Sequence, residues 1–261
     1  MKTSHRILAF GCHPDDVEFM CGGVLALLAR KGCEIHIATM AGGEMGSPTL
    51  TPKAIRAQRL KEAAQAATII GAAFHFAGGY DLEVEYNKEY RQRAVRIMRT
   101  VDPSIVFTHP PADYLVDHEE TSRLVRNAAY IASVRNYDCG APINNTARFP
   151  HVYYWNAMGL CDHFGHPRSV GMQIDISSVI ETKTAMLAAH SSQRRWLSHL
   201  NKVDEYIDMM RRQSREEGRR IKVAYAEGFT QFRGFGHPQD NVLKKLLGPL
   251  CREIRPNRTT R

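Results

Sequence analysis

Short apolar runs alternate with longer segments of helical periodicity through the first half of this chain. The apolar runs predict buried strands, and the longer segments predict the helices that connect them. This alternation is typical of an α/β protein. We therefore expect a Rossmann-like, doubly wound and mostly parallel sheet with helices on both faces, followed by strand and helix additions towards the C-terminus. The predicted strands are 7–12, 34–40, 73–77, 104–108, 151–156 and 172–176, and the predicted helices are 22–30, 53–70, 88–101, 119–133, 178–189 and 200–220.

A polar turn directly follows the first apolar run, where His13, Pro14, Asp15 and Asp16 come after the predicted strand. Pro14 cannot continue a hydrogen-bonded ladder, so the turn lies just past the carboxyl end of the strand, where open α/β sheets bind their ligands. His13 and Asp16 could hold one small cation, while Asp15 between them remains a free base. The alternative is that Asp15 or Asp16 only caps the following helix. Capping needs one carboxylate and no histidine, so the pattern favours the cation site.

A second polar segment, THPPADYLVDHEE at 108–120, follows the apolar run at 104–107. In the common 3-2-1-4 strand order the first and fourth strands are neighbours, and a crevice opens between their carboxyl ends. We therefore expect His118 beside His13 and Asp16, as a third ligand. Two nitrogens and one carboxylate oxygen, with one position left open, are typical of a catalytic zinc site, so we predict one Zn²⁺ per chain. Fe²⁺ or Co²⁺ would accept the same ligands.

These motifs resemble those of the PIG-L or LmbE-like family of zinc-dependent N-deacetylases. The family pattern of HPDD followed by two glycines stands here at 13–16 and 22–23, and its later HPxD…DH pattern stands at 109–118. The segment RLKE at 59–62 is similar to the family's RxxE, and AHSSQ at 189–193 is similar to its HxSQ. The matches keep their order from about residue 6 to about residue 193. We therefore expect a single LmbE-like deacetylase domain, with a core of about 6–193 and a C-terminal extension of about 194–261.

The resemblance implies a hydrolase that acts on a linear amide C–N bond and removes an N-acetyl group from an amino sugar or a related small molecule. It also implies that Asp15 takes the proton from a zinc-activated water. The family commonly places a histidine that stabilises the oxyanion three residues before the last ligand, but this chain has Leu115 there. Tyr114, His190 or His109 could replace it. His190 is slightly favoured, because an imidazolium can also protonate the leaving amine.

Other polar residues are candidates for binding the substrate or for positioning the ligands. Arg59 or Arg56 could hold a hydroxyl, carboxylate or phosphate of the substrate, although a surface role for either is equally open. Glu44 lies in a glycine-rich segment that resembles the pocket-edge loop of the family, and the glycines there could also mark only a turn. Asp117 could orient an imidazole by a hydrogen bond. The loops 138–149 and 159–169 are candidate lids on the substrate side.

The basic charge of the chain does not by itself indicate a nucleic-acid partner. The net charge is +8, but much of the excess lies in 211–220 and in the tail 252–261, and the helical stretch 200–220 interleaves acidic residues. Aromatic residues are not woven among these charges, so we expect a solvated helix and no nucleic-acid partner. No apolar run approaches the roughly 20 residues that span a bilayer, and no signal segment precedes the first strand. We expect a cytoplasmic protein without a membrane partner.

The six cysteines are scattered without CxxC spacing, so reduced core thiols are the better interpretation. Cys12 could in principle join the metal as a soft ligand, but strand alternation turns it away from His13. Two alternative functions stay open. One is a different metal-dependent amide or ester hydrolase, and the other is a metal-containing binding protein with little catalytic activity. The sequence leaves the choice between a monomer and a homo-oligomer open.

Overall fold

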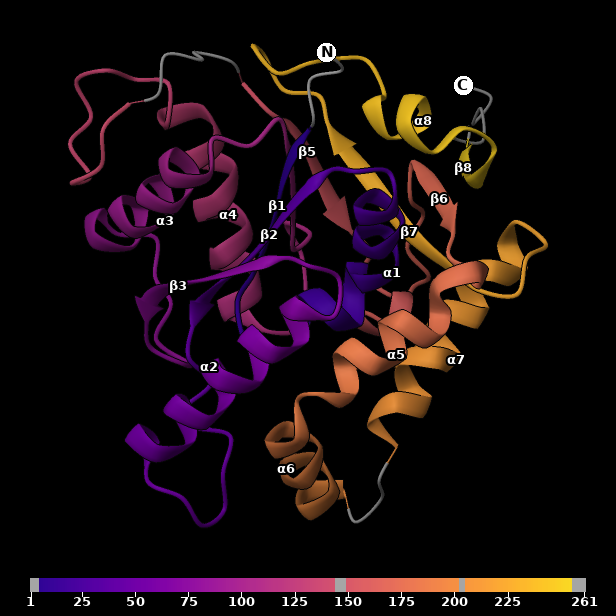
Figure 1. Ribbon diagram of the computed structural model, residues 1–261, viewed down its shortest axis with the longest axis horizontal. Helices are drawn as coiled ribbons and strands as arrows, with labels where there is room; N and C mark the ends of the chain where they lie inside the picture. The colour runs from indigo at the N-terminus through magenta and orange to yellow at the C-terminus, as the bar shows by residue number, and fades with distance from the viewer. Residues whose placement is uncertain (1–4, 144–148, 202–204, 255–261) are drawn as a thin grey trace.

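The computed structural model describes residues 5–143, 149–201 and 205–254, and an eight-stranded sheet runs through it (Figure 1). The strands are β1 (Arg6–Gly11), β2 (Glu34–Ala41), β3 (Ala73–Gly79), β4 (Ile105–Thr108), β5 (His151–Trp155), β6 (Met172–Asp175), β7 (Ala226–Phe232) and β8 (Cys251–Glu253). The helices are α1 (Asp16–Arg30), α2 (Pro52–Thr68), α3 (Lys88–Val101), α4 (Val116–Ile131), α5 (Ile180–Ala188), α6 (Ser191–Asn201), α7 (Tyr206–Arg220) and α8 (Val242–Leu247).

The strand order is β3-β2-β1-β4-β5-β7-β6-β8, which contains the predicted 3-2-1-4 arrangement. The first five strands in this order pair in parallel, and the remaining pairings, β5 with β7, β7 with β6 and β6 with β8, are antiparallel. In the register of the central strands, Phe10 at the end of β1 lies beside Thr108 at the end of β4. The turns that follow β1 and β4 therefore leave the sheet at the same edge, as the sequence predicted.

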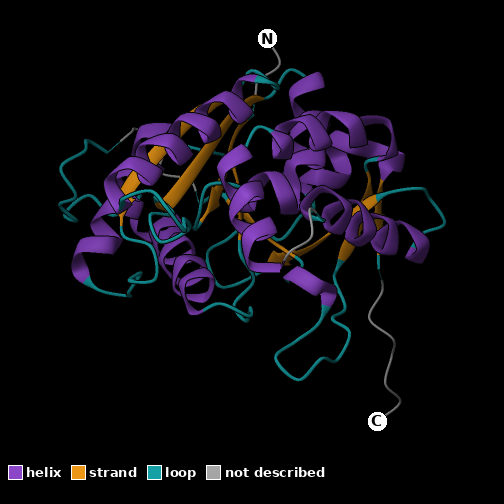
Figure 2. Cartoon of the chain, turned by 90° about the horizontal axis from the view of Figure 1, so that it is seen from below, coloured by secondary structure: helices purple, strands orange, loops and turns teal. Residues whose placement is uncertain are grey.

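Helices cover both faces of the sheet, which confirms the predicted fold class (Figures 1 and 2). Ile7 and Ala9 of β1 pack into a core with α1, α5, α7 and α8, whereas Leu8 and Phe10 pack into a second core with α3 and α4. All four side chains are fully buried. Burial on both faces explains why the strand reads as a continuous apolar run rather than as an alternating one.

The C-terminal part of the chain completes the sheet. Sequence reasoning missed β7, β8, α8 and most of α6, and β7, from the predicted extension, lies between β5 and β6 of the predicted core. The strand β7 was missed because it has no apolar run: Glu227 and Gln231 are buried in it among polar partners. The predicted helix 200–220 corresponds to the end of α6 and to α7, while residues 202–204 lie outside the described residues.

The helix α1 begins at Asp16, six residues before the predicted start at Gly22. The two glycines lie in the interior of the helix, where the backbone N–H groups of Gly23 and Val24 donate to the Glu227 carboxylate, both at 2.8 Å. A Cβ on Gly23 would lie 2.9 Å from Glu227 Oε1 and 2.8 Å from Ile176. Glycine is therefore required at this position for the close approach of β7 to the helix.

In the parts of the chain that the structure describes, no helix is both long and apolar enough to cross a membrane. All six cysteines are free, in line with the prediction of reduced thiols.

Candidate active site

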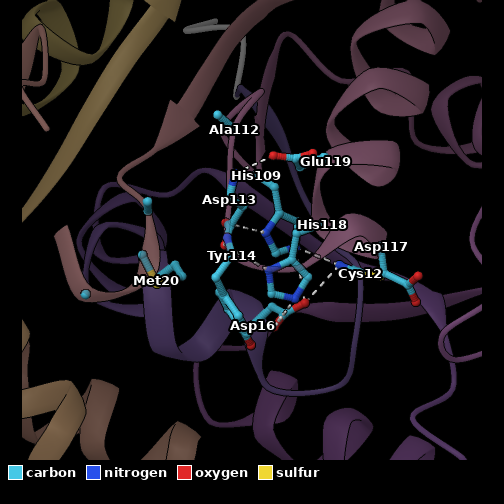
Figure 3. A network of polar contacts seen from close by, with 12 residues as sticks. Cys12, Asp16, Met20, His109, Ala112, Asp113, Tyr114, Asp117, His118 and Glu119 are labelled. Carbon is cyan, nitrogen blue, oxygen red and sulfur yellow. Dashed lines mark hydrogen bonds and ion pairs between the residues drawn. The ribbon is translucent and has the colours of Figure 1, made fainter. Parts of the chain in front are cut away.

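Three predicted ligands converge where β1 and β4 end. His13 lies in the turn after β1, Asp16 is the first residue of α1, and His118 lies in the first turn of α4. His13 Nδ1 is 3.3 Å from His118 Nε2 and 3.5 Å from Asp16 Oδ2, and His118 Nε2 is 3.5 Å from Asp16 Oδ1. Figure 3 shows the His118 ring and the Asp16 carboxylate facing each other. His13 and Asp16 come from one turn, His118 lies 105 residues from His13 in the sequence, and the strand order brings the two segments together.

Carboxylates lie behind both imidazoles. His13 Nε2 is 3.0 Å from Asp81 Oδ1 and 3.4 Å from Asp117 Oδ2, and His118 Nδ1 is 3.4 Å from Asp113 Oδ1. Such partners fix the orientation of metal-binding imidazoles and leave the opposite nitrogen free for the metal. Burial lowers the pKa of His118, and the neighbouring His109 lowers it further, which favours the neutral imidazole that a metal requires. The donor set and its outer carboxylates therefore fit a divalent metal.

The two oxygens of Asp16 have different partners. Oδ2 accepts hydrogen bonds from the backbone N–H groups of Cys12, at 3.0 Å, and of His13, at 2.7 Å. The ring of His109 stacks on that of His118 with centroids 4.0 Å apart, and His109 Nε2 lies 3.1 Å from the same Oδ2. Burial alone would raise the pKa of Asp16, but His118 and His109 hold it well below its usual range. Asp16 is therefore held as a carboxylate with Oδ1 directed towards the ligand cluster.

Asp15 lies beside the ligands but has separate partners. Its Oδ2 accepts a hydrogen bond of 2.6 Å from the Tyr206 hydroxyl, and its Oδ1 is 3.7 Å from the Arg59 guanidinium. Burial raises the pKa of Asp15 to about 6, against the opposing effect of Arg59. Neither Asp15 nor Asp16 provides a side-chain cap for α1 at its N-cap position, so the capping alternative does not describe this turn.

A cavity of about 270 Å³ opens over this cluster. Its wall contains His13, Asp15, Asp16, Phe19, Met45, Gly46, Arg59, Asp81, Leu82, Tyr114, Leu115, His118, Met158, Gln193, Trp196, Leu197, Tyr206 and Met209. The three ligands, the candidate base and two other predicted residues, Arg59 and Tyr114, therefore share one space. The aromatic ring of Tyr114 packs edge-on against His118, with centroids 5.3 Å apart.

Three other candidates lie outside the cavity wall. His190 is buried with its Nε2 3.4 Å from Glu18 Oε2, and it does not reach the wall. Glu44 is buried and forms an ion pair with Arg56, so the carboxylate is directed towards that arginine. His109 lies behind His118, as described above. The structure therefore does not bring His190 or Glu44, which we expected in catalysis and in substrate binding, to the cavity.

Arg59 is largely committed to the backbone. Its guanidinium donates to the carbonyl oxygens of Gly43, at 3.1 Å, and Pro14, at 2.9 Å. It therefore joins the loop after β2 to the loop that carries the ligands.

Cys12 Sγ lies 3.5 Å from His13 Nε2, on the side away from the ligand cluster, and burial raises the pKa of the thiol to about 11. A protonated thiol is a poor metal ligand.

The RxxE and HxSQ motifs meet in space. Glu62 on α2 accepts hydrogen bonds from the hydroxyl of Ser191, at 2.8 Å, and from the hydroxyl and the backbone N–H of Ser192, at 2.5 and 3.1 Å. These serines begin α6, whose residues Gln193 and Trp196 line the cavity. The two motifs together therefore hold one wall of the cavity in place.

Sequence reasoning missed Asp81 and Tyr206. Asp81 follows the strand β3 just as His13 follows β1, so the same rule of polar residues at strand ends could have found it. Tyr206 begins a helix of mixed charge, more than 190 positions from Asp15, and no local pattern distinguishes it. Only the fold shows that it contacts the candidate base.

Comparisons with known proteins identify the family that the chain resembles. Residues 8–129 match the family described as PIG-L: GlcNAc-PI de-N-acetylase, and this match includes all three candidate ligands. The match confirms the resemblance that the motifs indicate.

Two curated relatives and one solved structure extend the likeness over most of the chain. The chain is 25% identical over 237 residues to the 4-oxalmesaconate hydratase of Pseudomonas putida, covering 87% of this chain and 90% of that protein. It is 26% identical over 228 residues to the diacetylchitobiose deacetylase of Thermococcus kodakarensis, covering 83% and 82%. The N,N'-diacetylchitobiose deacetylase from Pyrococcus horikoshii has the same fold, with a TM-score of 0.73 and 23% identity over 88% of this chain and 85% of that chain.

Proposed function

This chain belongs to the PIG-L family through its residues 8–129, and from this membership we propose that it is a metal-dependent hydrolase. Its reaction is removal of an N-acetyl group from an amino sugar or a related small molecule. The relative named diacetylchitobiose deacetylase supports this choice of substrate. The observation that carries the proposal is the placement of Asp15, a buried carboxylate beside three convergent ligands in one cavity.

His13, Asp16 and His118 would hold the metal, with Zn²⁺ as the first choice for two nitrogens and one oxygen. A metal bound there would polarise the acetyl carbonyl and lower the pKa of water. Asp15 takes the proton from the attacking water and then delivers it to the leaving amine. The Tyr206 hydroxyl holds Asp15 Oδ2, so Asp15 Oδ1 is the oxygen available for this transfer.

Leu115 lines the cavity, but its side chain has no group that can donate to an oxyanion. Tyr114 is the better placed of the residues that could replace the missing histidine, because it lines the cavity and contacts His118, whereas His190 does neither. The phenol hydroxyl of Tyr114 is a hydrogen-bond donor. We therefore assign the donor role to Tyr114 rather than to His190, which the sequence slightly favoured.

The proposal is tested by metal analysis together with a substrate panel. The purified protein should contain about one divalent metal per chain, and it should release acetate from N-acetylglucosamine or from an N-acetylglucosaminide. Activity should disappear on chelation and return when Zn²⁺ is added. A metal-loaded protein that releases no acetate from any N-acetylated sugar would contradict the proposal.

A hydratase is the second candidate function, because the match to the hydratase of P. putida covers 87% of this chain. A hydratase adds water to a double bond and also needs a base beside an activated water. The two reactions are distinguished by adding a conjugated unsaturated dicarboxylic acid to the same metal-loaded preparation and following its absorbance over time. Loss of that absorbance without release of acetate would favour the hydratase.

A further inference from the structure

A groove continues from the cavity along α7. It encloses about 650 Å³, and Tyr114, Met158 and Met209 line both the groove and the cavity. Because the two spaces share these residues, a molecule bound over the metal ligands can extend into the groove. The volume is in the usual range for a small-molecule site. The cavity alone, at about 270 Å³, has less room for a substrate larger than one sugar ring.

The groove combines an apolar wall with a basic wall. Met158, Leu160 and Met209 supply the apolar side chains, and methionines adapt readily to ligands of different shape. The loop at 158–160 is attached to α7, since the N–H of Gly159 donates to Gln213 Oε1 at 2.9 Å. This contact indicates a preformed wall rather than a loose loop.

Three arginines of α7, Arg212, Arg215 and Arg219, line the basic wall, and among the described residues of the lining Glu216 is the one acidic residue. Positions three, four and seven apart lie on one face of a helix, so the three guanidinium groups are directed to the same side. The lining therefore carries three positive charges and one negative charge. This part of the substrate path favours an anion.

Arg212 and Arg219 are available for a ligand, whereas Arg215 donates to the Tyr225 hydroxyl at 3.2 Å. Arg212 pairs with Glu205 at 2.8 Å, with side chains 56% and 54% exposed, and Arg219 pairs with Glu216 at 2.9 Å, with side chains 70% and 49% exposed. Such exposed pairs contribute little to stability, so a carboxylate or phosphate can replace the glutamates at small cost. Arg211 of the same helix differs, because it pairs with Glu181 of α5 and does not line the groove.

Charge also sets the direction in which a substrate binds. Asp15, Asp16 and Asp81 line the cavity, so an anionic group is disfavoured there unless it contacts the metal, and it is favoured at the arginines. Building on the proposed function, we propose that the substrate is an N-acetylated molecule that carries a carboxylate or phosphate beyond an apolar spacer. The acetyl group lies over the metal ligands, the spacer contacts the methionines, and the anion binds Arg212 and Arg219.

The test compares the phenyl and 4-carboxyphenyl glycosides of N-acetylglucosamine. The carboxylate of the second compound reaches from the sugar across an apolar ring, as the groove requires. We expect the wild-type protein to show a KM roughly 3- to 10-fold lower for the 4-carboxyphenyl compound, with the difference decreasing in 0.5 M NaCl. In the variant with both Arg212→Gln and Arg219→Gln the ratio of KM values should approach one. Arg211→Gln, the matched control on the same helix, should keep the wild-type ratio.

Calorimetric binding of the same two glycosides separates failure of the groove from failure of the proposed function. If the 4-carboxyphenyl compound binds more tightly and this preference depends on the arginines, the proposed anion site in the groove is supported. If the same protein releases no acetate, the proposed deacetylase activity is refuted while the anion site stands. If each glycoside has the same KM in the wild type and in the variant, the proposed anion site in the groove is refuted and the proposed deacetylase activity is unaffected. If sedimentation shows a changed oligomeric state in the variant and the two glycosides bind with equal affinity, this face is an interface between copies of the chain. That result would also refute the proposed anion site.

Discussion

Asp15 has a backbone conformation that few L-residues adopt. Its φ is 109°, and aspartate and asparagine tolerate positive φ better than most other residues. Asp15→Asn should therefore keep the turn while removing the proton acceptor. We expect this variant to bind metal normally and to lose hydrolysis by about 10²- to 10⁴-fold, measured by metal content and acetate release. Asp240→Asn makes the same change at an exposed site and should be fully active. Near-normal turnover by Asp15→Asn would exclude Asp15 as the base.

Tyr206 is a positioning residue for Asp15. Its ring packs against Phe19 with centroids 5.7 Å apart, and its hydroxyl donates to Asp15. Tyr206→Phe keeps the ring and removes only the hydroxyl. We expect kcat to decrease by roughly tenfold with KM and metal content unchanged, since a hydrogen bond to a charged group is worth about 1.5–3 kcal/mol. Tyr153→Phe, which removes a hydroxyl bonded to Asn241, is the control and should keep its kcat. A change in KM alone would indicate a role in substrate binding instead.

Within α1, the adjacent glycines have different surroundings. A Cβ on Gly22 would lie 3.5 Å from Lys183, an ordinary contact, whereas one on Gly23 would lie under 3 Å from Ile176 and Glu227. Glu227 also forms a buried ion pair with Lys183 at 2.6 Å, so it cannot move without disturbing that pair. We expect Gly23→Ala to lower the free energy of unfolding by about 1–3 kcal/mol. Gly22→Ala should be neutral or stabilising, because alanine favours helix. Equal urea midpoints for the two variants would contradict this explanation.

The attachment of α6 to α2 should depend on pH. Burial alone would raise the pKa of Glu62, but hydrogen bonds from Ser192, Gln58 and Ser191 outweigh it and lower the pKa below 4.5. The carboxylate therefore stabilises the folded protein above pH 4.5. This contribution is lost as the pH falls through the pKa of Glu62 in the folded protein, which is lower than 4.5. We expect Glu62→Gln to lower the free energy of unfolding by about 1–3 kcal/mol at pH 7.

The difference in stability between wild type and Glu62→Gln should shrink as the pH falls below 4.5, as thermal melts at several pH values would show. Glu89→Gln removes an exposed glutamate of α3 that pairs with Arg93, and it should change stability little at any pH. A difference for Glu62→Gln that stays constant across this range would mean that its charge does not matter.

The sequence predicted the half of the sheet that builds the ligand cluster. Apolar runs that end in polar turns predicted the strands β1 to β4, and the common 3-2-1-4 order of doubly wound sheets was enough to bring His118 to His13. In the other half, β5 and β6 were also predicted from apolar runs, whereas β7 and β8 were not. In β7 a buried glutamate takes the place of an apolar residue because Lys183 neutralises it. The contact of Tyr206 with Asp15 depends on how α7 packs, and no local pattern records such long-range packing.

The ligand cluster joins distant parts of the chain, so the metal should stabilise the entire fold. The ligands come from the turn after β1, from α1 and from α4, and four further buried aspartates surround them, namely Asp15, Asp81, Asp113 and Asp117. A divalent cation offsets the mutual repulsion of these carboxylates. A ligand that binds only the folded state at about 1,000 times its Kd stabilises it by about 4 kcal/mol. For a chain of this length that corresponds to a Tm increase of roughly 10 °C.

We therefore expect chelation to lower the Tm of the wild-type protein by roughly 10 °C, and readdition of Zn²⁺ to restore it. His118→Ala should have a low Tm that neither chelation nor Zn²⁺ changes, because the third ligand is missing. His151→Ala, at the start of β5 and therefore at the opposite end of the parallel strands, should respond to chelation as the wild type does. Measured by differential scanning calorimetry, the comparison separates loss of a ligand from loss of any histidine. A His118→Ala protein that still gains about 10 °C on addition of Zn²⁺ would show that the metal binds elsewhere.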